Sequence, residues 1–290
     1  DVTINGRRLY VRQWGPPDAP AVVLLHGAGT HDRFELAEQA DHLARAGIVT
    51  LVADKRTADY SPWHRDYEAM SADALAAVDF LRGLRDVDPE RIGLFAESEG
   101  TWVAPVAAVR DPGIAYTIMV SAPIVSPLAQ ATYATLTAFE GLDVPDPVTG
   151  AVGKGIGLAT TLPNVLAYAE FDVLPWVARM QQPTLLIYGA EDPALPIIEA
   201  PELFFDATAA PADAVKVRYF EEAQHGIRQG SDGPFAPGYL DLLATWILRD
   251  GDIPGPRVAG GQPVQHLAAR PAPHPPWYAT AGTHMVVIGL

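Results

Sequence analysis

Along most of this chain, continuous apolar runs typical of buried strands alternate with segments whose apolar residues have helical spacing. Residues 21 to 27, "AVVLLHG", form a continuous apolar run that ends in glycine, as is typical of a strand covered on both faces. The next segment, "FELAEQADHLARAG", has apolar residues at helical spacing and stops at Gly47. The alternation repeats through "IVTLVAD", "SADALAAVDFLRGL", "RIGLFA" and "TWVAPVAAV". This rhythm predicts βαβ units with right-handed crossovers.

Further elements extend this pattern at both ends. "AYTIMVSAP", "PTLLIYG" and "VKVRYF" are predicted strands, and "YLDLLATWILRD" is a predicted final helix. Residues 1–14 alternate around Asn5 and Gly6, which predicts an antiparallel hairpin. Ser71 is a candidate N-cap for the second helix. The expected fold class is therefore α/β, with a mostly parallel sheet and helices on both faces.

Two segments depart from the rhythm. Residues 122–179 separate two strands by too much sequence for one crossover helix, so we expect an inserted helical cap there. Its "GAVGKGIG" has Gly155 where a phosphate loop needs Ser or Thr, so no nucleotide cofactor is expected. Residues 251–290 are rich in Pro and Gly and predict a tail. The core is then expected to comprise residues 1–121 and 180–250.

The composition excludes several classes of function. The formal net charge of −15 opposes binding to nucleic acid or an anionic membrane surface. With no cysteine there is no thiolate nucleophile, and no two histidines share a ligand-like spacing with a carboxylate, so no metal is expected. No apolar run approaches the roughly 20 residues that span a bilayer. We expect a soluble protein, cytoplasmic or exported after loss of a leader, whose partner is a small-molecule substrate.

One serine lies where a nucleophile is expected in such a fold. In "GLFAESEGTW", Ser98 follows a buried strand and precedes a helix, the context of a nucleophile elbow. A sharp strand-to-helix turn lifts the hydroxyl above the sheet edge and needs small residues two positions away on each side. Ala96 and Gly100 meet that need, although Ala96 stands where the usual motif has glycine.

A serine nucleophile needs a histidine and a carboxylate, which follow it in chain order in this fold. "LLIYGAEDPALP" supplies the acid, and we favour Asp192 over its neighbour Glu191 from its position after Gly189. "VRYFEEAQHGI" supplies His225 just past the last strand. Both segments end strands at the carboxyl edge of the sheet, where open α/β sheets place their sites. The other seven histidines are expected to be structural.

The remaining site expectations concern the oxyanion and the substrate. The backbone N–H groups of Glu99, directly after the nucleophile, and of Ala28, in "LLHGAG", are candidate oxyanion donors. Glu97 and Glu99 flank Ser98, which favours neutral or cationic substrates unless at least one carboxylate points away or pairs with a cation. We expect three aromatic residues to line an acyl or alcohol pocket: Tyr60, Trp63 and Trp176.

Four segments carry a resemblance to a known family. "VVLLHGAGTHDRFELAEQADHLARAGIVTLVADKR", "DPERIGLFAESEGTWVAP", "PTLLIYGAEDPALP" and "YFEEAQHGI", in this order, resemble bacterial α/β-hydrolases of the serine esterase and aminopeptidase-like group. The resemblance implies an eight-stranded sheet, a triad of Ser98, Asp192 and His225, and esterase or related acyl-hydrolase activity. The chain departs from its relatives at "TADYSPWHRDY", where a glycine-rich turn is usual, and after residue 250.

The sequence thus predicts a serine hydrolase that cleaves a carboxylic ester or lactone of a small neutral substrate through an acyl-enzyme. An amidase or peptidase would use the same three side chains, and the sequence does not separate the two. A C–C hydrolase, a cofactor-free peroxidase and a non-catalytic protein on the same scaffold are further alternatives.

Overall fold

A computed structural model describes residues 3–4, 7–12, 17–140, 142, 166–230, 233–265 and 267–269. The predicted turn at Asn5 and Gly6, the loop "GAVGKGIG" and residues 270–290 lie outside these ranges. Within them, no helix has both the length and the apolar character that a bilayer crossing needs.

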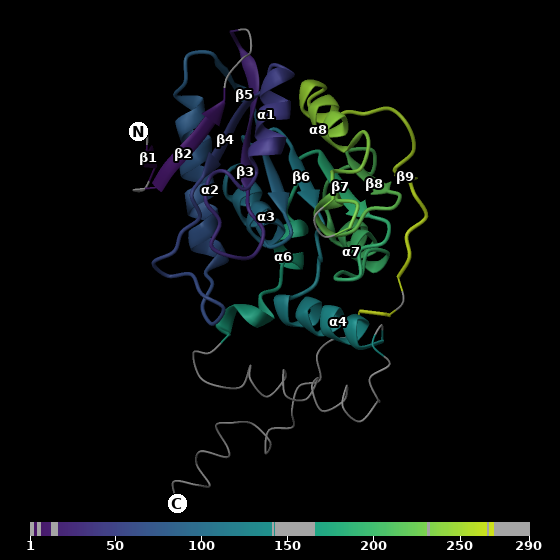
Figure 1. Ribbon diagram of the computed structural model, residues 1–290. Coiled ribbons are helices and arrows are strands. Elements are labelled where there is room, and N and C mark those ends of the chain that lie inside the picture. Colours follow the sequence, from purple (N-terminus) through teal and green to yellow (C-terminus); the bar gives the residue numbers. More distant parts are fainter. Residues whose placement is uncertain are drawn as a thin grey trace, which may run out of the picture.

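A sheet forms the centre of the molecule (Figure 1). Nine strands are present among the described residues, in the order β1 (Thr3–Ile4), β2 (Arg7–Arg12), β4 (Val49–Ala53), β3 (Ala19–Leu25), β5 (Val87–Glu97), β6 (Thr117–Val120), β7 (Thr184–Gly189), β8 (Val215–Phe220) and β9 (Val258–Gly260). β1 pairs antiparallel with β2, and β2 with β4, while all other pairs are parallel. The predicted α/β class and the N-terminal antiparallel pair are confirmed. β9 adds an edge strand from the predicted tail.

Helices cover both faces of this sheet (Figure 1). α1 (Ala37–Arg45) and α8 (Tyr239–Leu248) lie on one face, and α2 (Tyr67–Arg82), α3 (Gly100–Arg110), α6 (Leu174–Val177) and α7 (Glu199–Ala207) on the other. Successive residues of β3 serve opposite layers, since Val22 packs with Leu43 of α1 and Trp246 of α8, whereas Val23 packs with Val78 of α2. Burial on both faces explains why the parallel strands are continuous apolar runs.

The second helix begins earlier than its sequence suggested. α2 starts at Tyr67, and Asp66 is its N-cap, since the carboxylate accepts a 2.9 Å hydrogen bond from the backbone N of Ala69. The prediction that Ser71 caps this helix is wrong. Ser71 lies inside the helix, where its hydroxyl donates to the carbonyl of Glu68 at 2.7 Å.

The described part of the predicted cap contains short helices. α4 (Pro127–Glu140), the 3₁₀ turn η1 (Ala167–Glu170) and α6 fall between residues 122 and 179. α4 packs against η1 and lies outside the sheet and its helical layers (Figure 1). The side-chain amide of Gln130 in α4 donates to the carbonyl of Ala194 at 3.1 Å. The cap segment therefore touches the loop that follows β7, and its status as a separate unit stays a prediction.

Residues 251–265 follow the edge of the sheet instead of leaving it at once. After β9, the backbone N of Gly261 donates to Tyr219 O at 2.9 Å, and that of Val264 to Ala190 O at 2.8 Å. The side-chain oxygen of Gln265 then accepts from the N of Ile198 at 2.8 Å. Through its hydrogen bonds with Ala190 and Ile198, this segment restrains the loop between β7 and α7.

Candidate active site

Ser98 occupies a sharp turn between β5 and α3. Its φ of 49° lies in the left-handed region, which is uncommon for a residue with a side chain and recurs at functional turns. A Cβ on Gly100 would lie 2.9 Å from Leu25 O and 3.0 Å from His26 O. Gly100 must therefore be glycine because the end of β3 packs against it. Ala96, which stands where the usual motif has glycine, is fully buried, so the fold accommodates its methyl group.

A continuous chain of hydrogen bonds joins Ser98 to Asp192 through His225. His225 Nε2 lies 3.0 Å from Ser98 Oγ, and His225 Nδ1 lies 2.8 Å from Asp192 Oδ2. Asp192 is buried, and its other oxygen accepts a 2.9 Å hydrogen bond from the N of Ala194. Glu191 is exposed and directs only its backbone N toward this region, donating to Ala223 O at 3.0 Å. The structure thus brings Asp192, and not Glu191, to the histidine.

Close backbone packing holds the acid and histidine loops together. A Cβ on Gly189 would lie 2.3 Å from Gln224 O and 2.4 Å from Ala223 O, so only glycine fits between β7 and the histidine loop. On the other side, the backbone N of Gly226 donates to the buried hydroxyl of Ser121 at 3.2 Å. Ser121 follows β6, and the sequence analysis missed its supporting role because the contact joins residues 105 positions apart.

The surroundings of His225 favour its protonated form. Burial alone lowers the pKa of this imidazole, but the hydrogen bond and charge of Asp192, together with the charge of Glu97, raise it above its ordinary value. Burial likewise raises the pKa of Glu97, against the charges of His225 and Arg228. An imidazole with these partners is suited to accept a proton from Ser98 and to be stabilised as the cation.

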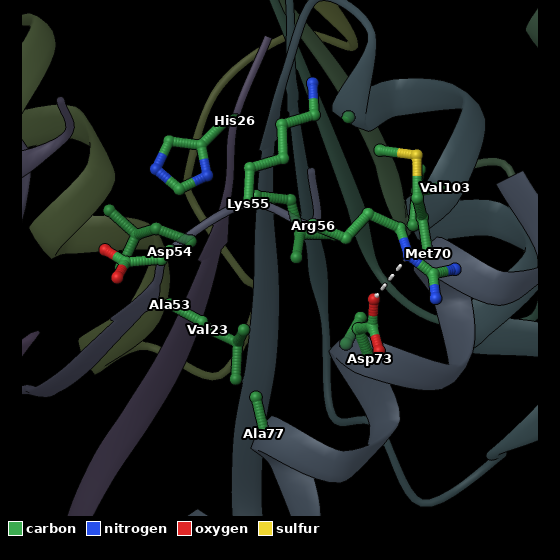
Figure 2. Close-up of a pocket in the computed structure, with 14 residues that line it drawn as sticks. Val23, His26, Ala53, Asp54, Lys55, Arg56, Met70, Asp73, Ala77 and Val103 are labelled. Atoms are coloured by element: carbon green, nitrogen blue, oxygen red, sulfur yellow. Dashed lines mark ion pairs between the residues drawn. The ribbon is translucent and has the colours of Figure 1, made fainter. Parts of the chain in front are cut away.

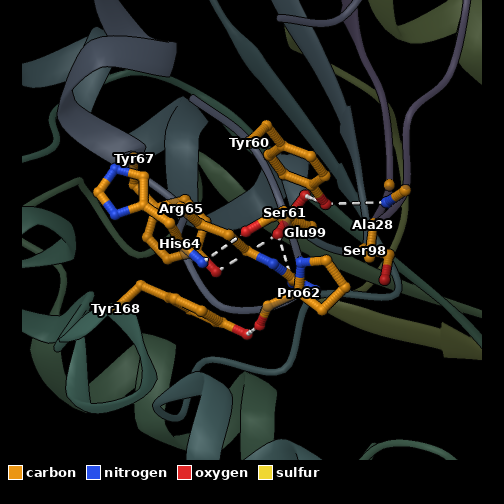
Figure 3. A network of polar contacts seen from close by, with 12 residues as sticks. Ala28, Tyr60, Ser61, Pro62, His64, Arg65, Tyr67, Ser98, Glu99 and Tyr168 are labelled. Atoms are coloured by element: carbon orange, nitrogen blue, oxygen red, sulfur yellow. Dashed lines mark hydrogen bonds and ion pairs between the residues drawn. The ribbon is translucent and has the colours of Figure 1, made fainter. Parts of the chain in front are cut away.

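The two candidate oxyanion donors lie on either side of Ser98 (Figure 3). The amide of Glu99 begins α3, where the first N–H groups have no partner within the helix. Ala28 lies beside Ser98 in the loop after β3, and a Cβ on neighbouring Gly27 would come within 3.5 Å of Ser98 Cβ. The carboxylate of Glu99 is buried and pairs with Lys55 and Arg65.

The three aromatic residues predicted to line a pocket lie in different surroundings. Tyr60 is buried, and its hydroxyl donates to Glu99 Oε2 at 2.7 Å instead of facing a substrate. Trp63 is 63% exposed on the loop before α2. Trp176 lies near the guanidinium groups of Arg110, the last residue of α3, and of Arg179. That Trp176 lines a substrate pocket stays a prediction.

A cavity lies behind the loop that carries Ala28, between β3, β4 and helices α2 and α3 (Figure 2). Its volume is about 60 Å³, which is room for a few water molecules. Most of its lining is apolar, and five polar residues also border it: His26, Asp54, Lys55, Arg56 and Asp73. The stem of Lys55 is thus incompletely packed on this side.

The fold and the hydrogen-bonded Ser98, His225 and Asp192 define an α/β-hydrolase of the serine esterase-like class. Residues 35–236 match the family model described as "Prolyl oligopeptidase family", and the chain belongs to that family. The expected resemblance to serine esterases is confirmed.

Known proteins agree with this assignment. An uncharacterised protein of Mycobacterium tuberculosis is 37% identical over 113 residues, 38% of this chain, and the match spans only 40% of that relative's length. Esterase EstD of Thermotoga maritima is 25% identical over 285 residues, covering 86% of this chain and 67% of its own. A monoacylglycerol lipase of Paleococcus ferrophilus shares the fold with a TM-score of 0.56 and 18% identity, over 84% of this chain and 99% of its own.

The buried His26 gives a testable pH dependence of stability. Burial, followed by the nearby charges of Lys55 and His31, lowers the pKa of His26 to about 4. Below pH 6.5 the unfolded chain binds a proton that the folded chain excludes, so stability present above pH 6.5 is lost as the pH falls toward 4. At about 1.4 kcal/mol per pH unit, the loss is on the order of 3 kcal/mol.

Urea unfolding of the wild type and of His26→Gln between pH 7 and pH 4 measures this effect. Gln retains a donor for the carbonyl of Asp32, which His26 Nε2 now approaches at 3.0 Å. We expect the free energy of unfolding to fall more steeply for the wild type than for the variant. Parallel curves across this range would contradict the account.

Proposed function

We propose that this protein is a serine hydrolase that cleaves a carboxylic ester or lactone through an acyl-enzyme formed on Ser98. The observation that carries the proposal is the hydrogen-bonded chain from Ser98 Oγ through His225 to the buried Asp192. In the proposed reaction Ser98 attacks the carbonyl carbon while His225 takes its proton. The imidazolium then protonates the departing alcohol, and water repeats the sequence in reverse to release the acid.

The amides of Ala28 and Glu99 are the proposed donors to the tetrahedral oxyanion. Their support is positional, since one follows the nucleophile and the other lies in the loop beside it (Figure 3). No step of this chemistry needs a metal or a cofactor. The named relatives EstD, a thiohydrolase of Aspergillus aculeatus and human serine hydrolase BPHL are consistent with hydrolysis as the general class.

We further propose that the substrate is neutral. The charge of Glu99 is offset by Lys55 and Arg65, whereas the charge of Glu97 acts on His225. The chain's net charge of −15 adds a long-range repulsion toward anions. Peptide or amide hydrolysis is the second candidate, because the matched family is named for an oligopeptidase.

Turnover of p-nitrophenyl esters of graded chain length, compared with that of an aminoacyl p-nitroanilide, separates these two candidates. We expect kcat/KM to be at least about tenfold higher for the best ester, because the anilide is a poorer leaving group that His225 must protonate. A higher kcat/KM for the anilide would replace the esterase proposal with a peptidase.

Covalent labelling tests the nucleophile. A fluorophosphonate should add once to the wild-type protein, as seen in the intact mass, and Ser98→Ala should show no adduct. Activity of that variant should fall to the roughly 10³–10⁴-fold enhancement over water that binding and oxyanion donors supply alone. Labelling that persists in Ser98→Ala would remove Ser98 from the proposed role.

The choice of acid is tested by two neighbouring isosteric changes. Asp192→Asn should lower kcat on the order of 10⁴-fold, because an amide no longer holds His225 in the required tautomer. Glu191→Gln is the matched control and should leave kcat within about twofold, since that side chain is exposed. Equal losses in the two variants would show that Asp192 is not the acid.

A further inference from the structure

Glu99 contributes two groups to the neighbourhood of Ser98, and the proposed mechanism uses only one of them. Its amide is a proposed oxyanion donor, whereas its carboxylate is buried with 1% of the residue exposed. That carboxylate accepts hydrogen bonds from Arg65 and, at 2.7 Å, from the hydroxyl of Tyr60 (Figure 3). It also accepts one from Lys55 Nζ. Tyr67 adds a longer hydrogen bond at 3.5 Å. A buried carboxylate with four donors is firmly fixed.

The same donors also hold the opposite side of the proposed oxyanion site. Lys55 Nζ donates a second hydrogen bond to the carbonyl of Gly27, and the hydroxyl of Tyr60 accepts one from the backbone N of Gly29 at 2.8 Å. Gly27 and Gly29 are the two neighbours of Ala28. Lys55 and Tyr60, which both bind Glu99, therefore also hold this loop through the residues on either side of Ala28.

Packing alone does not place Lys55. Its side chain borders the cavity of about 60 Å³ behind the loop, so apolar contacts are missing on that side (Figure 2). Burial lowers the pKa of Lys55, and the charge of Glu99 opposes that shift. The ammonium group is held by its two acceptors, Glu99 and Gly27 O, and by the ring of Tyr60, whose centroid lies 4.3 Å from Nζ.

The charges of this group also suit an oxyanion. Two cationic side chains, Lys55 and Arg65, face one carboxylate, which leaves one formal positive charge in excess behind the loop. Such a charge attracts a developing oxyanion, and the attraction is stronger in a partly dry site than in water. Glu99 next to the nucleophile is then compatible with catalysis.

We propose that Glu99, Lys55 and Tyr60 are positioning residues that hold the amides of Ala28 and Glu99 at the separation an oxyanion requires. These three side chains form one hydrogen-bonded bridge between the loop after β3 and the start of α3. The inference rests on the proposed serine-hydrolase function. It assigns a role to the aromatic Tyr60 that replaces the pocket-lining role expected from the sequence.

Two tyrosine-to-phenylalanine changes test this bridge. Tyr60→Phe removes the hydroxyl that binds both Glu99 and Gly29, whereas Tyr67→Phe removes one that donates to the same carboxylate at 3.5 Å and, among the hydrogen bonds of the described residues, does not join it to residues 27–29. For Tyr60→Phe we expect kcat on p-nitrophenyl acetate to fall roughly tenfold, a fraction of the 10²–10³ that a whole donor supplies, with KM within about twofold. Tyr67→Phe should retain kcat within about twofold.

Inhibition gives a readout that a general loss of stability would not reproduce. A trifluoromethyl ketone forms a hemiketal oxyanion on the serine, so its Ki should rise for Tyr60→Phe by the same factor by which kcat falls. A neutral, non-reactive ester analogue should bind both variants and the wild type alike. Lys55→Met should show the same pattern with a larger loss, and Lys55→Arg should recover part of it.

The outcomes separate this inference from the proposed function. If the fluorophosphonate does not label Ser98 in the wild type, the proposed function fails, and the positioning role fails with it. If the wild type is labelled and turns over esters, but Tyr60→Phe and Tyr67→Phe have equal kcat and equal Ki for the ketone, only the positioning role is overturned. Equal thermal midpoints of the two variants ensure that a difference in kcat does not reflect unfolding.

Discussion

The packing of Gly100 against the end of β3 is the constraint on which the site depends. Because no side chain separates this glycine from the carbonyls of Leu25 and His26, the start of α3 lies directly against the loop that follows β3. Ser98, two residues before this contact, has its φ of 49° in the left-handed region, and Ala28 lies beside it in the loop after β3. Every later feature of the proposed chemistry, from the oxyanion donors to the reach of His225, assumes this contact.

A second close approach performs the same task for the other half of the site. Gly189 lets the loop after β8 cross the end of β7, so that Asp192 and His225 face each other at hydrogen-bonding distance. The segment after β9 then fixes the acid loop through Ala190 and Ile198. Two glycine contacts between backbones therefore set the geometry, and polar side chains hold it.

Local sequence signals were sufficient for the elements and for the order of the site residues. Apolar runs and turns placed β3, β5, β7 and β8, and strand ends in an α/β sheet converge on one edge, which is why Ser98, Asp192 and His225 could be found from the chain alone. The position of Asp192 after Gly189 separated it from Glu191, and burial of Asp192 alone agrees with that choice.

Contacts between distant segments were beyond those signals. Glu99 and Lys55 lie 44 positions apart, and nothing in either local pattern indicates that they pair. The sequence around Tyr60 predicts a residue that lines a pocket, whereas its hydroxyl forms hydrogen bonds with Glu99 and Gly29. The edge strand β9 was missed because its pairing with β8, rather than its Pro- and Gly-rich composition, determines its structure.

The central claim is that one oxygen bound to a tetrahedral centre on Ser98 receives two backbone hydrogen bonds. A crystal structure of the protein after phosphonylation by a fluorophosphonate measures this directly, because the phosphoryl oxygen occupies the place of the oxyanion. The account predicts that this oxygen lies about 2.7–3.1 Å from the backbone N atoms of both Ala28 and Glu99. An adduct on Ser98 whose oxygen points to solvent or to other donors would contradict it.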